Sequence, residues 1–237
     1  MISNPYVLAL TLASSVTILF KVYRHYRRKK IEPIEPMINE VLFFPDAEFP
    51  CTKVVRGLTS SGGKDLDPWI ACRNPSCRKL HGYKHESPSS LIRFLIYLSK
   101  ARESVDLCIY VFTQSFLAET LYNLHSSGLR VRIITDGAED EAFSSQVERL
   151  QKAGLRIKSN KRGTGALMHH KFVIVDDKIL LSGSFNWTNK AVVNNYEAVL
   201  VTSSPELVDP FVSQFDILWE TFHDHPVKGG YSWHLDR

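Results

Sequence analysis

The most constraining feature of this sequence is a pair of basic residues placed two positions apart inside an apolar run. Residues 167–175 are dominated by β-branched and apolar side chains, so they predict a strand. Because side chains two positions apart on a strand share a face, His169 and Lys171 should point the same way and His170 the opposite way. An imidazole beside a fixed ammonium suits attack on a phosphodiester: one group can bond to phosphorus while the other holds the negative oxygens.

The residues around this pair extend the pattern. Asp176 completes the sequence H-x-K-x4-D, and Gly183, Ser184 and Asn186 follow as G-S-x-N. Together these patterns resemble the signature of the phospholipase D superfamily, the HKD motif. The resemblance implies that His169 attacks phosphorus to form a phosphohistidine. It also implies that Lys171, Ser184 and Asn186 bind the phosphoryl oxygens.

Two carboxylates complete the expected catalytic set. The resemblance assigns Glu197 to the ring nitrogen of His169 that does not attack, where a carboxylate would fix the tautomer and raise the basicity of the ring. Asp176 belongs to the motif, but seven positions from His169 on a strand it should lie on the opposite face and well away. We therefore expect Asp176 to brace the local structure rather than to touch substrate. A coincidental His-Lys pair is the competing explanation, and the five further matching positions disfavour it.

The motif occurs once in the chain. The superfamily mechanism needs a second imidazole to protonate the leaving oxygen. We therefore expect a homodimer in which His169 of each subunit meets across a two-fold axis, one as nucleophile and one as general acid. Catalysis by this route needs no divalent metal.

The N-terminal region predicts a membrane anchor. Residues 2–20 are almost wholly apolar and uncharged, and a basic cluster (Lys21, Arg24, Arg27, Arg28, Lys29, Lys30) follows at once. A helix of about 19 residues rises about 29 Å, the thickness of the hydrocarbon layer. The positive-inside rule then leaves the rest of the chain in the cytosol. A cleaved signal sequence, which would carry its charge before the apolar run, is the alternative. Outer mitochondrial membrane anchors have this layout, although the endoplasmic reticulum accepts similar segments.

The positive net charge of +4 comes from this anchor. Residues 31–237 contain 23 Lys and Arg against 25 Asp and Glu, so their net charge is −2. The basic isoelectric point is therefore no evidence for nucleic-acid binding, because attraction to anionic lipid headgroups explains the cluster.

Three cysteines and a histidine form the pattern C-x20-C-x4-C-x3-H, at Cys51, Cys72, Cys77 and His81. Such a set can close a tetrahedral zinc site, and the metal would supply folding free energy to a segment with few apolar residues. Three unrelated cysteines and an exposed histidine are the alternative. The fourth cysteine, Cys108, lies in an apolar strand and is expected in the core.

The remaining pattern alternates strands with amphipathic helices, which predicts an α/β sandwich with a mixed, largely parallel sheet and helices on both faces. Strands are expected near residues 41–44, 105–112, 129–135, 155–159, 167–175, 178–182 and 196–202, and helices near 91–98, 115–126, 139–152 and 206–222. The expected parts are an anchor with its basic flank (1–30), a linker and first strand (31–50), a zinc-binding insertion (51–84) and a phospholipase D-like catalytic domain (85–237).

The single motif, the anchor and the cysteine-rich segment together resemble the Zucchini group of the superfamily, the mitochondrial phospholipase D enzymes. The resemblance implies a homodimer on the outer mitochondrial membrane that cleaves single-stranded RNA in the biogenesis of PIWI-interacting RNAs in germ cells and meiosis, with PIWI-pathway proteins as partners. Cardiolipin hydrolysis to phosphatidic acid is the competing assignment. A non-catalytic RNA-binding scaffold is a third, which the intact His169, Lys171, Asn186 and Glu197 disfavour.

Substrate contacts outside the motif are less specific. Four basic residues flank it and could follow a nucleic-acid backbone, namely Lys158, Lys161, Arg162 and Lys190. An ordinary solvated face explains them equally well. A lipid-hydrolysing site would need an apolar mouth, for which Phe185 and Trp187 are candidates, although at least one should pack beneath the G-S-x-N loop.

Overall fold

The computed structural model describes residues 36–46, 49, 89–136, 145–160 and 166–225. The expected membrane anchor, the four expected zinc ligands, Lys161 and Arg162 lie outside these ranges. Within them, no helix has the length and apolar character to cross a membrane. The same residues bring together no group of three or more His, Cys, Asp or Glu that could hold a metal ion.

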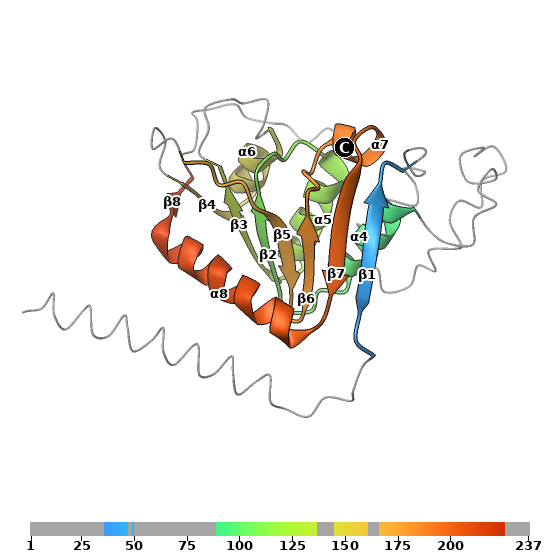
Figure 1. Ribbon diagram of the computed structural model, residues 1–237. Helices are drawn as coiled ribbons and strands as arrows, with labels where there is room; N and C mark the ends of the chain where they lie inside the picture. The colour runs from blue at the N-terminus through green and yellow to red at the C-terminus, as the bar shows by residue number, and fades with distance from the viewer. Residues whose placement is uncertain (1–35, 47–48, 50–88, 137–144, 161–165, 226–237) are drawn as a thin grey trace, which may run out of the picture. The chain divides into compact units, whose positions relative to one another are not determined.

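Eight strands form one mixed sheet in the order β1-β7-β6-β5-β2-β3-β4-β8 (Figure 1). Their bounds are β1 Asn39–Phe44, β2 Ser104–Ile109, β3 Arg130–Thr135, β4 Arg156–Ser159, β5 Lys171–Val175, β6 Ile179–Gly183, β7 Glu197–Thr202 and β8 His223–Asp224. Of the pairings among these described strands, β2–β3 and β3–β4 are parallel, and the other five are antiparallel.

The prediction of a largely parallel sheet is therefore wrong, although the sheet is mixed as expected. The connection between β5 and β6 comprises only residues 176–178. A parallel pair needs a crossover of a dozen or more residues, so such a short connection can only join antiparallel strands.

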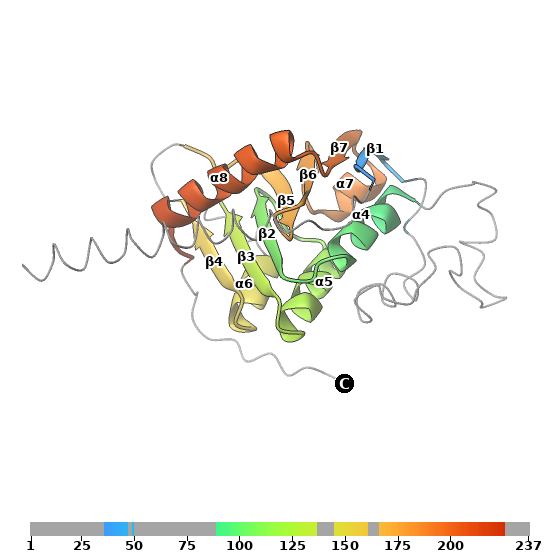
Figure 2. The same ribbon diagram turned by 90° about the horizontal axis from the view of Figure 1, so that it is seen from below.

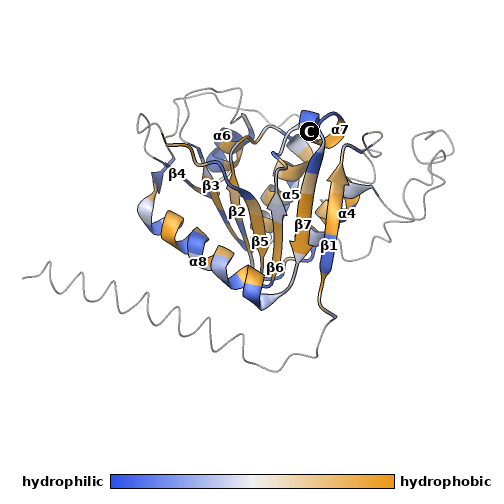
Figure 3. Ribbon diagram, viewed as in Figure 1, coloured by the Kyte–Doolittle hydropathy of each residue, from blue (hydrophilic) through white to orange (hydrophobic). Residues whose placement is uncertain are grey.

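Helices cover both faces of the sheet, as predicted. Figure 2 shows α4 (Ser90–Ser99), α5 (Ser115–Ser126) and α6 (Ser145–Lys152) on one face and α8 (Pro205–Thr221) across the other. A short helix, α7 (Asn189–Val193), lies in the connection from β6 to β7. Hydrophilic and hydrophobic residues alternate around α8, whose apolar side packs on the sheet (Figure 3). Each face therefore has its own apolar core.

β5 is buried on both sides, which explains its unbroken apolar sequence. Val173 and Val175 belong to the larger core on the side of α4 and α5. Phe172 and Ile174 belong to the core under α8. Cys108 lies in this second core and is fully buried, as predicted; burial raises the pKa of its thiol well above the usual value.

β1 forms one edge of the sheet. It pairs with β7 along its whole length, from Asn39 opposite Thr202 to Phe44 opposite Glu197. Residues 50–88 thus fall in the sequence between two strands of one sheet, β1 and β2. Ile38 and the predicted catalytic domain (85–237) belong to the same compact unit, Ile38–Arg237.

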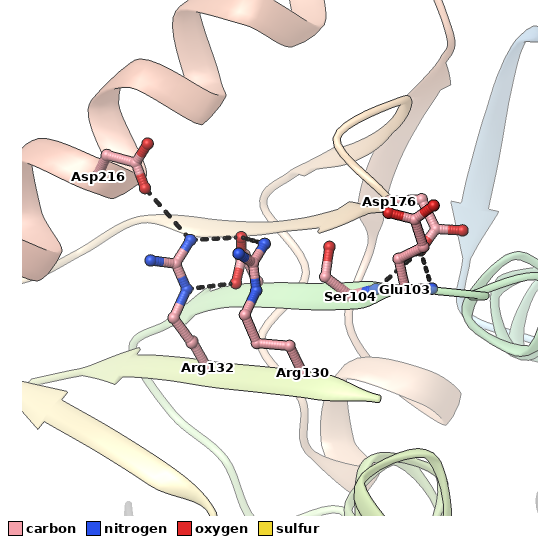
Figure 4. A network of polar contacts seen from close by, with 7 residues as sticks. Glu103, Ser104, Arg130, Arg132, Asp176 and Asp216 are labelled. Carbon is pink, nitrogen blue, oxygen red and sulfur yellow. Dashed lines mark hydrogen bonds and ion pairs between the residues drawn. The ribbon is translucent and has the colours of Figure 1, made fainter. Parts of the chain in front are cut away.

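A buried ion pair joins the sheet to α8 (Figure 4). Arg132 lies directly opposite Asp106 and donates two hydrogen bonds to its carboxylate, at 2.8 and 2.7 Å. The same guanidinium donates to Asp216 of α8 at 3.2 Å and lies over the rings of Phe215 and Trp219. Burial alone would lower the pKa of Arg132, but the hydrogen bonds and charges of the two carboxylates outweigh it and raise that pKa.

Candidate active site

The predicted catalytic residues gather at one end of the sheet. β5 and β7 begin there, and β2 and β6 end there, because β5 is antiparallel to both β2 and β6 and β7 is antiparallel to β6. In Figure 1 this is the upper end of the sheet, beside α7. Four segments that are separate in the sequence therefore supply side chains to one site.

His169 and Lys171 lie together on one side of the chain, as predicted. Lys171 Nζ donates to the backbone oxygen of His169 at 2.8 Å. The ring of Tyr110 contacts both residues: its centroid is 4.6 Å from that of the His169 ring and 5.1 Å from Lys171 Nζ. The ring of His170 packs on Phe172, which belongs to the core under α8.

The predicted strand at 167–175 is shorter in the structure. β5 begins at Lys171, whose partner on β2 is Ile109, the last residue of that strand. Beyond Ile109 the partner strand ends, so His169 has no residue of β2 opposite it to form a ladder. His169 therefore lies in the exposed segment that leads into β5.

Sequence reasoning did not identify Tyr110. Its only signal is its place directly after a buried strand, which becomes informative once β2 is known to pair with β5. The ring supports the imidazole by aromatic contact and the ammonium by a cation–π contact.

Lys171 is partly withdrawn from water. Burial lowers the pKa of its ammonium, and the charge of Glu197 partly offsets this by raising it. A small pocket adjoins the lysine and is lined otherwise by Phe94, Phe172, Val173, Leu181, Phe185, Trp187 and Val199. A cation in such apolar surroundings interacts more strongly with an anionic oxygen than the same cation in bulk water.

Glu197 has other partners than the predicted one. Its carboxylate accepts hydrogen bonds from the hydroxyl of Ser184 and, at 3.0 Å, from the side-chain amide of Asn195. Among the described residues of one chain, no hydrogen bond joins Glu197 to the His169 ring. The reason is the strand order: β6 separates β7 from β5, so the two strands are roughly 10 Å apart.

The G-S-x-N loop is held firmly in place. Ser184 donates its hydroxyl proton to Glu197 and accepts the N–H of Ala198 at 3.2 Å, so it links the loop to β7. The side-chain oxygen of Asn186 accepts the N–H of Val111 at 3.3 Å. This bond orients the amide, and its NH₂ is the end that can donate to a phosphoryl oxygen.

Phe185 and Trp187 pack beneath this loop. Both are 2% exposed, so neither presents an apolar surface to solvent. Phe185 stacks on Phe44 at 4.2 Å between centroids, and Trp187 meets Phe112 edge-on at 5.0 Å. The exposed apolar side chains near the site are instead Leu167 and Tyr196, at 60% and 94% exposed.

Asp176 braces the far end of β5, as predicted. Its carboxylate accepts the backbone N–H groups of Arg102, Glu103 and Ser104, the shortest bond to each being 2.8 Å. Figure 4 shows Asp176 beside Glu103 and Ser104. Asp176 and Asp177 both have a positive φ, of 54° and 56°, as the central residues of a tight hairpin turn require. Five strand residues separate this turn from the segment that carries His169.

The basic residues expected to bind substrate are divided by the structure. Lys158 donates its ammonium to the backbone oxygen of Trp219 and lies over the Trp219 ring, 5.1 Å from its centroid. Its ammonium is thus engaged with α8. Lys190 is exposed on α7, at the same end of the sheet as the site.

Comparison with known proteins supports the interpretation of these residues as a phospholipase D motif. Residues 94–219 match the family model described as cardiolipin synthase, PLD-like domain. A mitochondrial cardiolipin hydrolase of Chlamydomonas reinhardtii is 40% identical over 185 residues, which cover 78% of this chain and 74% of that protein. The Homo sapiens protein of the same name is 35% identical over 220 residues, covering 93% and 80%. The phospholipase D family member Nuc from Salmonella typhimurium shares the fold, with a TM-score of 0.54 at 18% identity over 80% of this chain and 98% of that chain.

Proposed function

The chain belongs to the phospholipase D superfamily, and within it to the group of mitochondrial cardiolipin hydrolases or Zucchini proteins, and from this premise we propose that it cleaves phosphodiesters through a phosphohistidine at His169. The superfamily consists of phosphodiesterases that include nucleases and phospholipases. The observation that carries the proposal is the placement of His169 beside the partly buried ammonium of Lys171, with the oriented amide of Asn186 at the same end of the sheet.

The proposed reaction has two steps. In the first, a ring nitrogen of His169 bonds to phosphorus while the bond from phosphorus to the leaving oxygen breaks, and a second imidazole gives that oxygen a proton. In the second, the same imidazole takes a proton from water, whose oxygen displaces His169. Lys171 and Asn186 hold the phosphoryl oxygens, where negative charge develops.

The second imidazole is proposed to be His169 of another copy of the chain. His170, the neighbouring histidine, packs on Phe172 on the opposite side. It therefore cannot serve as the acid for a phosphate bound beside Lys171. A two-fold axis at the upper end of the sheet would bring two copies of His169 together. Glu197 would then be available to orient an imidazole across this axis rather than within its own chain.

Single-stranded RNA is the proposed substrate, in the biogenesis of PIWI-interacting RNAs. Lys190 is exposed at the site end of the sheet and could hold a neighbouring phosphate. The burial of Phe185 and Trp187 removes the apolar mouth that acyl chains would need there. A phosphohistidine route needs no 2′-hydroxyl, so the products should carry 5′-phosphate and 3′-hydroxyl ends.

Cardiolipin is the second candidate substrate. The relatives share the name mitochondrial cardiolipin hydrolase, and two exposed apolar side chains, Leu167 and Tyr196, lie close in sequence to His169 and Glu197. The name of these relatives also supports a mitochondrial location. We further propose that residues 1–30 hold the chain in the outer membrane with its catalytic domain in the cytosol, and that residues 51–84 bind a structural zinc ion.

One set of measurements tests these assignments. The purified full chain in detergent is incubated with end-labelled single-stranded RNA and, separately, with vesicles containing cardiolipin. We expect cut RNA, no effect of added chelator, and an acid-labile phosphorylated protein that is absent from the His169→Asn variant. Intact RNA alongside released phosphatidic acid would make cardiolipin the substrate. Full activity of His169→Asn on both substrates would refute the proposed mechanism.

A further inference from the structure

A buried carboxylate outside the motif holds the segment that carries His169. Asp136 directly follows β3 and is 7% exposed. Its Oδ2 atom accepts the backbone N–H of Met168 at 2.7 Å and the side-chain N–H of Asn160 at 3.1 Å. The same nitrogen of Asn160 donates to the backbone oxygen of Ala166 at 2.8 Å. Asp136 and Asn160 therefore fix two backbone groups within three residues of His169.

The segment that carries His169 needs these hydrogen bonds because the sheet supplies none from β2. The ladder between β2 and β5 stops at Lys171, so residues 166–170 have no strand opposite them on β2. The side chain of Met168 is 3% exposed and packs in the core under α8. Its N–H is therefore shielded from water and needs an acceptor within the protein. The carboxylate of Asp136 satisfies it one residue before His169.

We propose that Asp136, with Asn160, is a positioning residue that sets the backbone from which the His169 imidazole reaches phosphorus. This inference rests on the proposed role of His169 as nucleophile. A carboxylate suits the task because one oxygen can accept two donors in strong, charge-assisted hydrogen bonds. Tyr110 contacts the His169 ring, whereas Asp136 holds the backbone from which the His169 side chain extends. Loss of the hydrogen bonds to Asp136 should impair the attack of His169 on phosphorus and leave the phosphate ligands Lys171 and Asn186 in place.

The test compares Asp136→Ala and Asp136→Asn with the wild type in the full detergent-solubilised chain. The matched control is Thr202→Ala, because Thr202 is fully buried and its hydroxyl accepts the N–H of Ser204 at 3.1 Å, at the opposite end of the sheet. Activity is measured on bis(4-nitrophenyl) phosphate, a small phosphodiester that requires neither a base nor an acyl chain to be recognised. The Cε1–H signal of His169, identified by its absence from His169→Asn, is recorded by NMR.

For Asp136→Ala we expect kcat to fall about 100-fold and KM to change by less than about threefold, since a misplacement near 1 Å has this effect on kcat. Asp136→Asn should be intermediate, because its amide oxygen can still accept the Met168 N–H. The His169 signal should shift or broaden in both variants. Thr202→Ala should keep the wild-type kcat and His169 signal below its own melting temperature.

Two results would overturn the proposal: a folded Asp136→Ala variant with the wild-type kcat, or an unmoved His169 signal in that variant. If Asp136→Ala does not fold, Asp136→Asn and Asn160→Ala decide by the same two readouts. A wild-type chain that cleaves no phosphodiester would refute the proposed function instead. The NMR comparison would then still show whether Asp136 positions His169.

Discussion

Replacing Asp176 separates a structural role from a catalytic one. Although it belongs to the HKD motif, its carboxylate binds three successive backbone N–H groups at the start of β2, at the far end of β5 from His169. Its φ of 54° lies in the left-handed region, which Asp and Asn adopt more easily than Ala. Asp176→Ala therefore removes the hydrogen-bond acceptors of three N–H groups and places in the turn a residue that adopts a positive φ less easily.

The size of the loss follows from the burial of the three donors. Ser104 is 4% exposed, so leaving its N–H without an acceptor should cost about 1–3 kcal/mol. Arg102 and Glu103 are exposed, and water can replace the carboxylate at their N–H groups. The positive φ adds about 1 kcal/mol for alanine. We therefore expect a loss near 3 kcal/mol and a fall in melting temperature of about 6–12 °C for a domain of this size.

Three substitutions divide this loss into its parts. Asp176→Gly removes the carboxylate acceptors, but glycine adopts a positive φ without strain, so this variant should be destabilised less than Asp176→Ala. Asp176→Asn keeps one acceptor oxygen and should lose the least. Thermal unfolding followed by circular dichroism measures the order, and kcat is measured 15 °C or more below each midpoint, where every variant is folded. A tenfold fall in kcat with an unchanged melting temperature would refute the bracing role.

Three further predictions concern other parts of the domain. Tyr110→Ala should lower kcat about fivefold because the His169 ring loses a supporting contact of roughly 1 kcal/mol, whereas Tyr110→Phe should keep the wild-type rate on bis(4-nitrophenyl) phosphate because the ring contact remains. Asp106→Ala should cost about 3–5 kcal/mol in urea unfolding because it leaves the buried Arg132 charge without its bidentate partner, and the paired Asp106→Leu, Arg132→Met variant should recover most of that loss. Burial, together with flanking charges, lowers the pKa of His170 below its ordinary 6.5, so the unfolded state binds the proton more readily and stability should fall as pH drops through 6.5. His170→Gln should flatten that fall, and an unchanged slope between pH 7 and 5 would contradict this.

Local patterns in the sequence predicted most elements well. The expected helix at 115–126 is α5, and the strands expected at 129–135 and 196–202 are β3 and β7 to within a residue. In these segments the apolar period, the capping residues and the packing all favour the same structure. The short helix α7 and the two-residue strand β8 were not predicted, because segments of this length carry too little periodicity to be seen.

The sheet pairing was harder to predict, and the errors at the site follow from it. Tyr110 and Asp136 come from the ends of β2 and β3, and they meet the His169 segment only because β5 lies beside β2. Neither residue has a signal in the sequence near the motif. The prediction that Glu197 pairs with the His169 ring likewise did not specify whether both belong to one chain, and within one chain β6 separates β7 from β5. The motif indicates which of its own residues take part in the chemistry. The pairing of the strands determines which other residues lie beside them.

The spacing of the HKD motif has a physical explanation in this fold. The four residues between Lys171 and Asp176 complete one five-residue strand, which at about 3.3 Å per residue crosses roughly 17 Å of sheet. The His and Lys lie at the end where β5 begins, and the Asp lies where it turns into β6. Shortening the strand by one residue would turn Lys171 to the opposite face, away from Tyr110, while Asp176 stayed bound to the start of β2. The spacing from Lys171 to Asp176 is thus the distance between a reactive end and an anchored end of the same strand, and a phosphate held by Lys171 is out of reach of the Asp176 carboxylate.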